Sequence, residues 1–261
     1  MMMTLYRNRS VVLRLALAAM MIAGLAPGAN AQGLLDAFFG AAPGRMESFC
    51  HRGTNIAVER FDPAGGCRQP ALIILHGSDG PHKYAAKYRQ AAAMAARRGY
   101  VVFMVQYFDA TGTCPDDPTI MNMNAPRFKT WVSTVRAAVS YAAAQDNVDP
   151  LRIGLIGFSV GSYVALSAAS ADSRIGAVVD FFGGMPAAYA RKASIMPPVI
   201  ILHGQCDDMV SVCEAHKLDR QLKKLGRPHE LVIYPGQGHI FDKAASKDAA
   251  ERTFVFLETY L

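Results

Sequence analysis

The sequence lacks the features that would place it in several large protein classes. Its cysteines and histidines do not show the spacing of a zinc site, so we expect no structural metal. No internal repeat is present, and no linker separates two folded segments. The longest apolar run near the N-terminus has about 12 residues, whereas a membrane-spanning helix needs roughly 20.

That short apolar run has the pattern of an export signal. Arg7, Arg9 and Arg14 precede the apolar residues 15–26, and the small-residue motif "ANA" ends at Ala31. A basic segment, a short apolar segment and an A-x-A site are typical of a secretory signal peptide. We therefore predict that residues 1–31 are removed after Ala31 and that the protein is periplasmic or secreted. An uncleaved membrane anchor is the alternative; after cleavage no stable anchor remains.

Removal of this segment changes the charge balance. It carries three of the 27 Lys and Arg residues and none of the 21 Asp and Glu residues, which leaves a formal charge of +3. Such a small excess gives no argument for nucleic-acid binding. Residues 32–261 suit a single α/β domain with a sizeable core.

All five cysteines lie after the predicted signal peptide, so export would permit disulfides. The sequence does not fix their pairing, and the odd count leaves at least one thiol or an intermolecular bond. We favour Cys50–Cys67 and Cys206–Cys213, with Cys114 left over, although neither pairing is better than an even choice.

Strand and helix signals alternate after residue 70. Short continuous apolar runs, typical of strands buried on both faces, alternate with Ala-rich helical segments. The expected strands cover 71–77, 100–106, 152–157, 175–182, 198–204 and 230–235, with one or two antiparallel edge strands within 47–61. The expected helices lie near 83–99, at 127–145, after Ser159 and near 246–261, and one more runs from a Ser211–Glu214 capping box to Gly226. A polar loop is expected at 107–126. This pattern predicts an α/β fold: a mostly parallel sheet with helices on both faces and no large lid domain.

One motif in this pattern carries chemistry. In "RIGLIGFSVGS", a buried strand runs into Gly-Phe-Ser-Val-Gly, and a small-residue helix follows. A strand–G-x-S-x-G–helix turn is the nucleophile elbow, whose glycines permit a sharp, strained turn that exposes the serine. The context therefore favours Ser159 as a catalytic nucleophile over a serine in an ordinary turn.

Serine needs a base and an acid nearby. Of the seven histidines, only His239 lies in a Gly-rich loop after the last strand, "PGQGHIF", although a surface-loop role is equally compatible with that position. Asp207 and Asp208 follow the fifth parallel strand, and one of them would orient the imidazole while the other caps a turn. The order Ser, Asp, His is that of the α/β-hydrolase triad.

The oxyanion site would combine two backbone N–H groups. We predict that of Val160, directly after the nucleophile, and that of Ser78 in the loop "HGSDG". Asp79 is expected to cap the helix that follows. Phe182 and Met185 follow the fourth parallel strand and can shape a pocket, although packing is the simpler explanation for both.

The motifs "LHGSDG", "GFSVGS", "LHGQCDDMV" and "YPGQGHIF" resemble the dienelactone hydrolase family of α/β hydrolases across roughly residues 47–261. In the family pattern the acid is the aspartate four residues after the histidine of the second "HG", which here is Asp207. Dienelactone hydrolases proper carry cysteine in the elbow and a glutamate in the loop after the first parallel strand. Here the elbow holds Ser159, and "HGSDG" has no glutamate.

The sequence thus predicts a serine hydrolase that acts on a small-molecule carboxylic ester or lactone through Ser159, His239 and Asp207, with no cofactor. A peptidase, thioesterase or acyltransferase could use the same triad, and a non-catalytic binding protein could keep the scaffold. The sequence does not indicate an oligomeric state.

Overall fold

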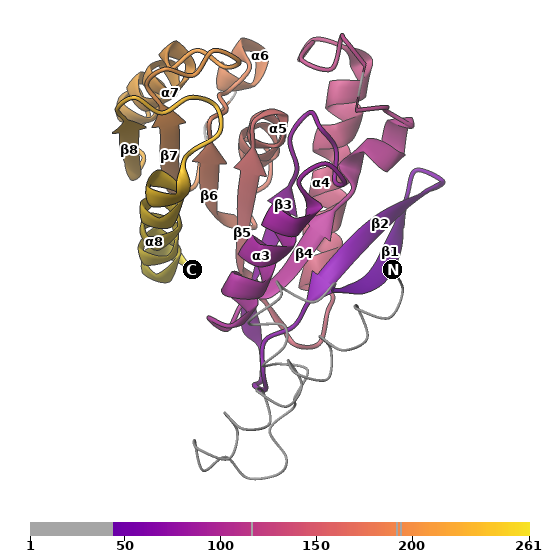
Figure 1. Ribbon diagram of the computed structural model, residues 1–261. Coiled ribbons are helices and arrows are strands. Elements are labelled where there is room, and N and C mark those ends of the chain that lie inside the picture. The colour runs from indigo at the N-terminus through magenta and orange to yellow at the C-terminus, as the bar shows by residue number, and fades with distance from the viewer. Residues whose placement is uncertain (1–43, 116, 192, 194) are drawn as a thin grey trace, which may run out of the picture. The chain divides into compact units, whose positions relative to one another are not determined.

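The computed structural model describes residues 44–115, 117–191, 193 and 195–261, so the predicted signal peptide, residues 1–31, lies outside the described residues. Within them, eight strands form one sheet in the order β1-β2-β4-β3-β5-β6-β7-β8 (Figure 1). The strands are β1 (Arg45–His51), β2 (Thr54–Phe61), β3 (Gln69–Leu75), β4 (Val101–Val105), β5 (Val148–Phe158), β6 (Ile175–Phe181), β7 (Val199–Gly204) and β8 (His229–Tyr234). The β1–β2 and β2–β4 pairs are antiparallel, and the other pairs are parallel.

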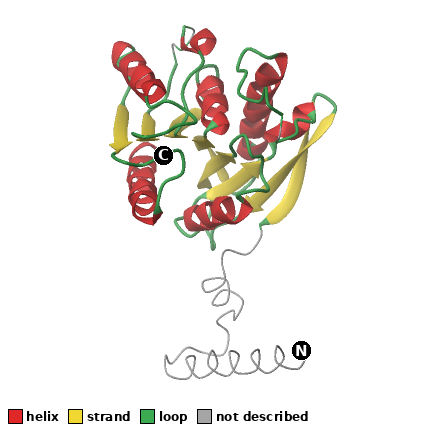
Figure 2. Ribbon diagram, turned by 45° about the horizontal axis from the view of Figure 1, so that its top comes forward, coloured by secondary structure: helices red, strands yellow, loops and turns green. Residues whose placement is uncertain are grey.

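Helices cover both faces of this sheet (Figure 2). They are α3 (Ala85–Ala96), the 3₁₀ helix η1 (Tyr107–Thr111), α4 (Pro126–Ala143), α5 (Val160–Ala169), α6 (Ala187–Ala190), α7 (Cys213–Lys224) and α8 (Lys243–Tyr260). One core cluster joins α4, α5 and α7 to one face, and a second joins α3 and α8 to the other. The predicted α/β fold with a mostly parallel, doubly covered sheet is confirmed.

The alternation along β3 shows how the two clusters arise. Ile73 and Leu75 contribute to the cluster under α4, α5 and α7, whereas Leu72 and Ile74 contribute to the cluster under α3 and α8. Successive side chains of a strand point to opposite faces, so a strand buried on both faces must be apolar throughout. The continuous apolar runs in the sequence reflect this double burial.

Two local expectations were wrong. The segment 107–126 is not wholly irregular, because η1 begins it and buries Tyr107 and Phe108. The Ser211–Glu214 capping box does not form: the Ser211 hydroxyl accepts a hydrogen bond from the Cys213 N–H at 3.3 Å, and the Glu214 carboxylate pairs instead with Lys217. The helix begins at Cys213, too late for the reciprocal bonds of a capping box.

Candidate active site

Ser159 occupies a strained turn between β5 and α5. Its φ of 52° and ψ of −119° lie in a region that non-glycine residues rarely adopt. A Cβ at Gly157 would collide with the backbone of Ser162, and one at Gly161 would collide with the carbonyl oxygens that end β3. The two glycines of G-x-S-x-G are therefore required because the backbone packs closely on both sides of Ser159.

The carboxylate of Asp207 contacts the imidazole of His239. Asp207 Oδ2 lies 2.8 Å from His239 Nδ1, and Oδ1 accepts hydrogen bonds from the N–H groups of Met209 and Val210 at 2.9 and 2.8 Å. Asp207 and His239 are 9% and 7% exposed, whereas the neighbouring Asp208 is exposed to solvent. Of the two aspartates, it is thus Asp207 that can hold the imidazole in one tautomer.

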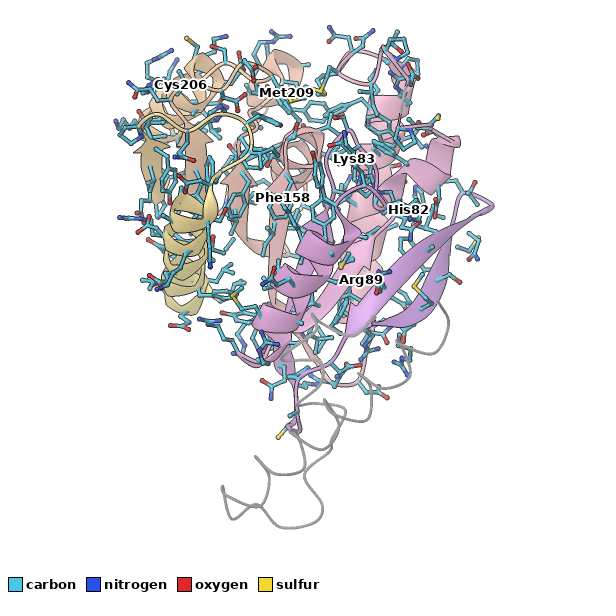
Figure 3. All side chains as sticks on the ribbon, viewed as in Figure 1. His82, Lys83, Arg89, Phe158, Cys206 and Met209 are labelled. Carbon is cyan, nitrogen blue, oxygen red and sulfur yellow. The ribbon has the colours of Figure 1, made fainter. Side chains whose placement is uncertain are left out.

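The His239 loop is held against the end of β7 by direct backbone contacts. The N–H of Cys206 donates to the carbonyl of Gln237 at 2.8 Å, and a Cβ at Gly204 would collide with that same carbonyl. Cys206 lies above the end of β7 in Figure 3, within this junction. On its other side, the ring of His239 lies against Phe182, with 4.6 Å between ring centres. The imidazole is therefore positioned from two directions.

Ser159 and His239 line the same cavity, which has a volume of about 510 Å³. Ser159 is 5% exposed, and Asp207 lies behind the histidine, away from the cavity lining. No hydrogen bond joins the Ser159 hydroxyl to His239 among the described residues. Catalytic hydrogen bonds are often long in the absence of substrate and tighten only in the bound state.

The loop that holds Ser78 is fixed through the residues next to it. His76 Nδ1 donates to the carbonyl of Gly77 at 2.8 Å, and the N–H of Gly77 donates to the Tyr88 hydroxyl at 3.1 Å. In a trans peptide the carbonyl and the N–H point in opposite directions, so the bond from His76 also orients the Ser78 N–H. Burial lowers the pKa of His76 to about 4 and keeps its ring neutral.

Of the two predicted oxyanion donors, Ser78 lines the cavity beside Ser159, whereas Val160 is fully buried and does not. Within the described part of the chain, neither the N–H of Ser78 nor that of Val160 has a hydrogen-bond partner. The N–H of Val160 belongs to the first turn of α5, where no intrahelical acceptor exists. Asp79, expected to cap the next helix, instead pairs with Lys83 at 2.8 Å.

Sequence reasoning missed much of the cavity wall. Its aromatic and long apolar side chains come from α3 and the residue before it, from the strand ends and from the loop before α8. Phe182 is the one predicted contributor, whereas Met185 is buried and does not line the cavity. The exposed Lys87 and Lys243 stand at its edge. The apolar part of the wall comprises Tyr84, Tyr88, Ala91, Met94, Phe158, Phe181, Phe182, Ile240, Phe241 and Ala250. No local motif marks a helix residue as cavity-lining, because the crossing of helix and sheet decides it.

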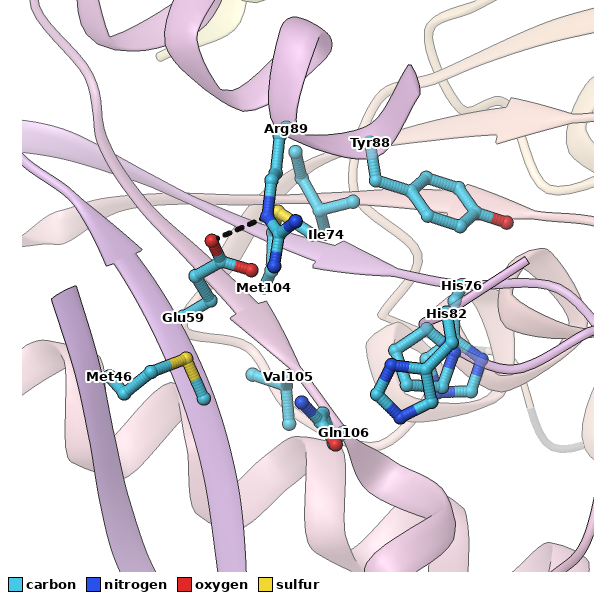
Figure 4. Close-up of a pocket in the computed structure, with 11 residues that line it drawn as sticks. Met46, Glu59, Ile74, His76, His82, Tyr88, Arg89, Met104, Val105 and Gln106 are labelled. Atoms are coloured by element: carbon cyan, nitrogen blue, oxygen red, sulfur yellow. Dashed lines mark hydrogen bonds and ion pairs between the residues drawn. The ribbon is translucent and has the colours of Figure 1, made fainter. Parts of the chain in front are cut away.

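A second, smaller cavity lies behind the Ser78 loop (Figure 4). Its volume is about 130 Å³, and Ser159 does not line it. The figure shows the guanidinium of Arg89 paired with Glu59, at 2.7 Å, on one side and His76 on the other. Since its charged groups are already paired, this cavity offers less for chemistry than the larger one.

The five cysteines are free and exposed, so the favoured pairings Cys50–Cys67 and Cys206–Cys213 are not present in this structure. Cys50 lies in β1 and Cys67 beyond the end of β2, so the hairpin does not bring them together. Among the described residues, no group of three His, Cys, Asp or Glu side chains is arranged to hold a metal ion. In the same part of the chain, no helix is both long and apolar enough to cross a membrane.

Comparisons with known proteins agree with this architecture. A curated relative, Protein usf from Aquifex pyrophilus, is 21% identical over 231 residues and the match covers 84% of this chain and 99% of that protein. A solved dienelactone hydrolase-like promiscuous phosphotriesterase from metagenomic libraries superposes with a TM-score of 0.71 at 19% identity, over 83% of this chain and 98% of that one. The apo form of esterase 2 from Thermogutta terrifontis gives a TM-score of 0.66 at 19% identity, over 83% and 94%.

These structural likenesses, at such low identity, show the α/β-hydrolase fold. The sequence model of the "Dienelactone hydrolase family" matches residues 56–261, from β2 to the last residue. A match over so much of the chain is decisive for the family. The chain belongs to the dienelactone hydrolase family of α/β hydrolases.

Proposed function

We propose that this hydrolase cleaves a carboxylic ester or lactone with Ser159 as nucleophile, His239 as base and Asp207 as the acid that orients His239. One observation carries the proposal: the Asp207–His239 hydrogen bond of 2.8 Å ends at the cavity into which the strained turn of Ser159 also opens. A nucleophile, an oriented base and backbone N–H groups without an acceptor in the protein are the parts that acyl transfer requires.

The reaction would begin with proton transfer from the Ser159 hydroxyl to Nε2 of His239. The Ser159 oxygen bonds to the acyl carbon, and the carbonyl electron pair moves to its oxygen, where the N–H groups of Ser78 and Val160 stabilise the charge. Collapse of this intermediate breaks the bond to the alcohol oxygen, which takes the proton from His239. Water then gives a proton to His239 and its hydroxyl to the acyl carbon, and Ser159 leaves with its proton restored.

The cavity indicates which part of the substrate is bulky. Most of its wall is aromatic or aliphatic, from Phe158, Phe181 and Phe182 beside the nucleophile to Met94 on α3. An apolar wall of this size stabilises a large apolar group by removing it from water. We therefore propose substrates with an aromatic or extended aliphatic group, not acetyl esters.

A covalent probe tests the nucleophile. The protein is treated with a fluorophosphonate and weighed intact, beside Ser159→Ala and the matched control Ser246→Ala, which removes another serine lining the same cavity. We expect one adduct in the parent and in Ser246→Ala and none in Ser159→Ala. An adduct that persists in Ser159→Ala, or no adduct in the parent, would contradict an activated Ser159.

Export is a separate proposal that rests on the N-terminal pattern alone. Expression of the full chain in a Gram-negative host, followed by N-terminal sequencing of the periplasmic product, tests it. The expected first residue is Gln32. Recovery of the protein only from the cytoplasm or membrane, with Met1 intact, would reject both the cleavage and the periplasmic location.

A further inference from the structure

A second histidine lies behind the triad, fully buried at the end of β7. His203 has no exposed surface, and its Nε2 lies 2.8 Å from the carbonyl oxygen of Val210 and 3.3 Å from Asp207 Oδ2. A carbonyl oxygen only accepts hydrogen bonds, so Nε2 must carry the hydrogen. The N–H of Val210, the residue whose carbonyl takes this hydrogen, donates to Asp207 Oδ1 at 2.8 Å.

We propose that His203 is a positioning residue for the catalytic acid: its Nε2–H holds the carbonyl of Val210, and the N–H of Val210 in turn holds the carboxylate of Asp207 that orients His239. The contacts run from His203 through Val210 and Asp207 to His239, from the core to the cavity. The proposal rests on the proposed function, because it assumes that Asp207 acts through His239. His203 itself does not line the cavity and touches no substrate.

The test compares His203→Leu with His203→Gln. Leucine removes the donor, whereas the glutamine amide can donate to the Val210 carbonyl in place of Nε2. With the concentration of active sites measured by fluorophosphonate titration, we expect kcat to fall about 10- to 100-fold in His203→Leu, because the buried Val210 carbonyl loses its partner and Asp207 its fixed position. KM should stay within about twofold. His203→Gln should recover kcat to within about threefold of the parent.

The outcomes separate the two proposals. If the parent neither hydrolyses esters nor takes the adduct, the proposed function fails. If the parent is active and His203→Leu keeps the parental kcat, or if the glutamine variant is as impaired as the leucine variant, the positioning role is refuted and the function stands.

A measurement on the parent protein does not depend on whether the variants fold. With ¹⁵N-labelled histidine, Nε2 of His203 should be protonated at neutral pH, assigned through its contact with Val210. An unprotonated Nε2 would overturn the proposal.

Discussion

Replacement of Asp207 by asparagine should abolish most activity while leaving the fold nearly unchanged. Oδ1 of Asp207 accepts two backbone hydrogen bonds, from Met209 and Val210, so the amide oxygen of asparagine will keep that side. The amide NH₂ then takes the place of Oδ2 and faces the donor Nδ1–H of His239 at 2.8 Å.

Two donors cannot bond to each other, so the imidazole of His239 must change its tautomer. Its lone pair would move to Nδ1 and its hydrogen to Nε2, where the base is needed. The nucleophile then has no acceptor for its proton. A wrong tautomer of this kind costs about 10³- to 10⁴-fold in kcat/KM, or about 4 to 5.5 kcal/mol of transition-state stabilisation.

Steady-state hydrolysis of a p-nitrophenyl ester measures this loss, and intact mass after fluorophosphonate treatment measures it independently. Asp208→Asn is the matched control, because it removes the neighbouring carboxylate, which is exposed to solvent. We expect Asp208→Asn to retain parental kcat/KM. Parental activity in Asp207→Asn, or a large loss in Asp208→Asn alone, would refute the assignment of the acid.

Three further predictions concern the packing, the loop and the cavity. Gly161→Ala places a Cβ against backbone carbonyls at the end of β3 that cannot move aside, so the free energy of unfolding in urea should fall by about 3 kcal/mol. The control Gly112→Ala meets only open space and should lower the free energy of unfolding by about 1 kcal/mol. Equal losses in the two variants would contradict the close approach at Gly161. The pKa of His76 is about 4 in the folded protein and 6.5 in the unfolded chain, so the unfolded chain binds more protons between these two values. The free energy of unfolding should therefore fall by up to about 3 kcal/mol as the pH drops through this window. In urea titrations His76→Gln should lose this part of the pH dependence, and a free energy of unfolding that falls with pH as in the parent would contradict the prediction. Met94 lines the cavity, so Met94→Trp fills space that a long acyl group would occupy. It should reduce kcat/KM for long acyl esters about 10-fold relative to acetyl esters. Equal effects on both esters would mean that the acyl group does not enter this cavity.

The parallel part of the fold could be read from the sequence because burial on both faces leaves a simple signal. The apolar runs of β3 and β7 were located to within about two residues. The 3₁₀ helix η1 gave no such signal: its five residues are too few for a helical period. Tyr107 is buried because its ring stacks on His76, with 4.4 Å between ring centres, and that partner lies 31 positions earlier in the chain.

The order of the candidate site residues along the chain could be predicted from the sequence, but the choice between the two neighbouring aspartates could not. Spacing alone left Asp207 and Asp208 equivalent, and family resemblance favoured Asp207; in the structure its buried side chain meets His239. His203 entered the sequence argument only as the histidine of the second "HG", from which Asp207 is counted. Its contact with the Val210 carbonyl depends on how the chain turns after β7, which is a property of the folded loop.

The close packing of the backbone around the site also indicates where substrate preference can change. Ser159 and His239 are held by contacts between main chains, at Gly161 against β3 and at Gly204 against the His239 loop, where no larger residue fits. Any substitution there displaces Ser159 or His239. The opposite wall of the cavity consists of side chains from α3 and α8, such as Met94 and Lys243, which no main-chain contact of this kind constrains. New specificity should therefore be sought on these two helices, because their side chains can change size and charge without moving the nucleophile or its base.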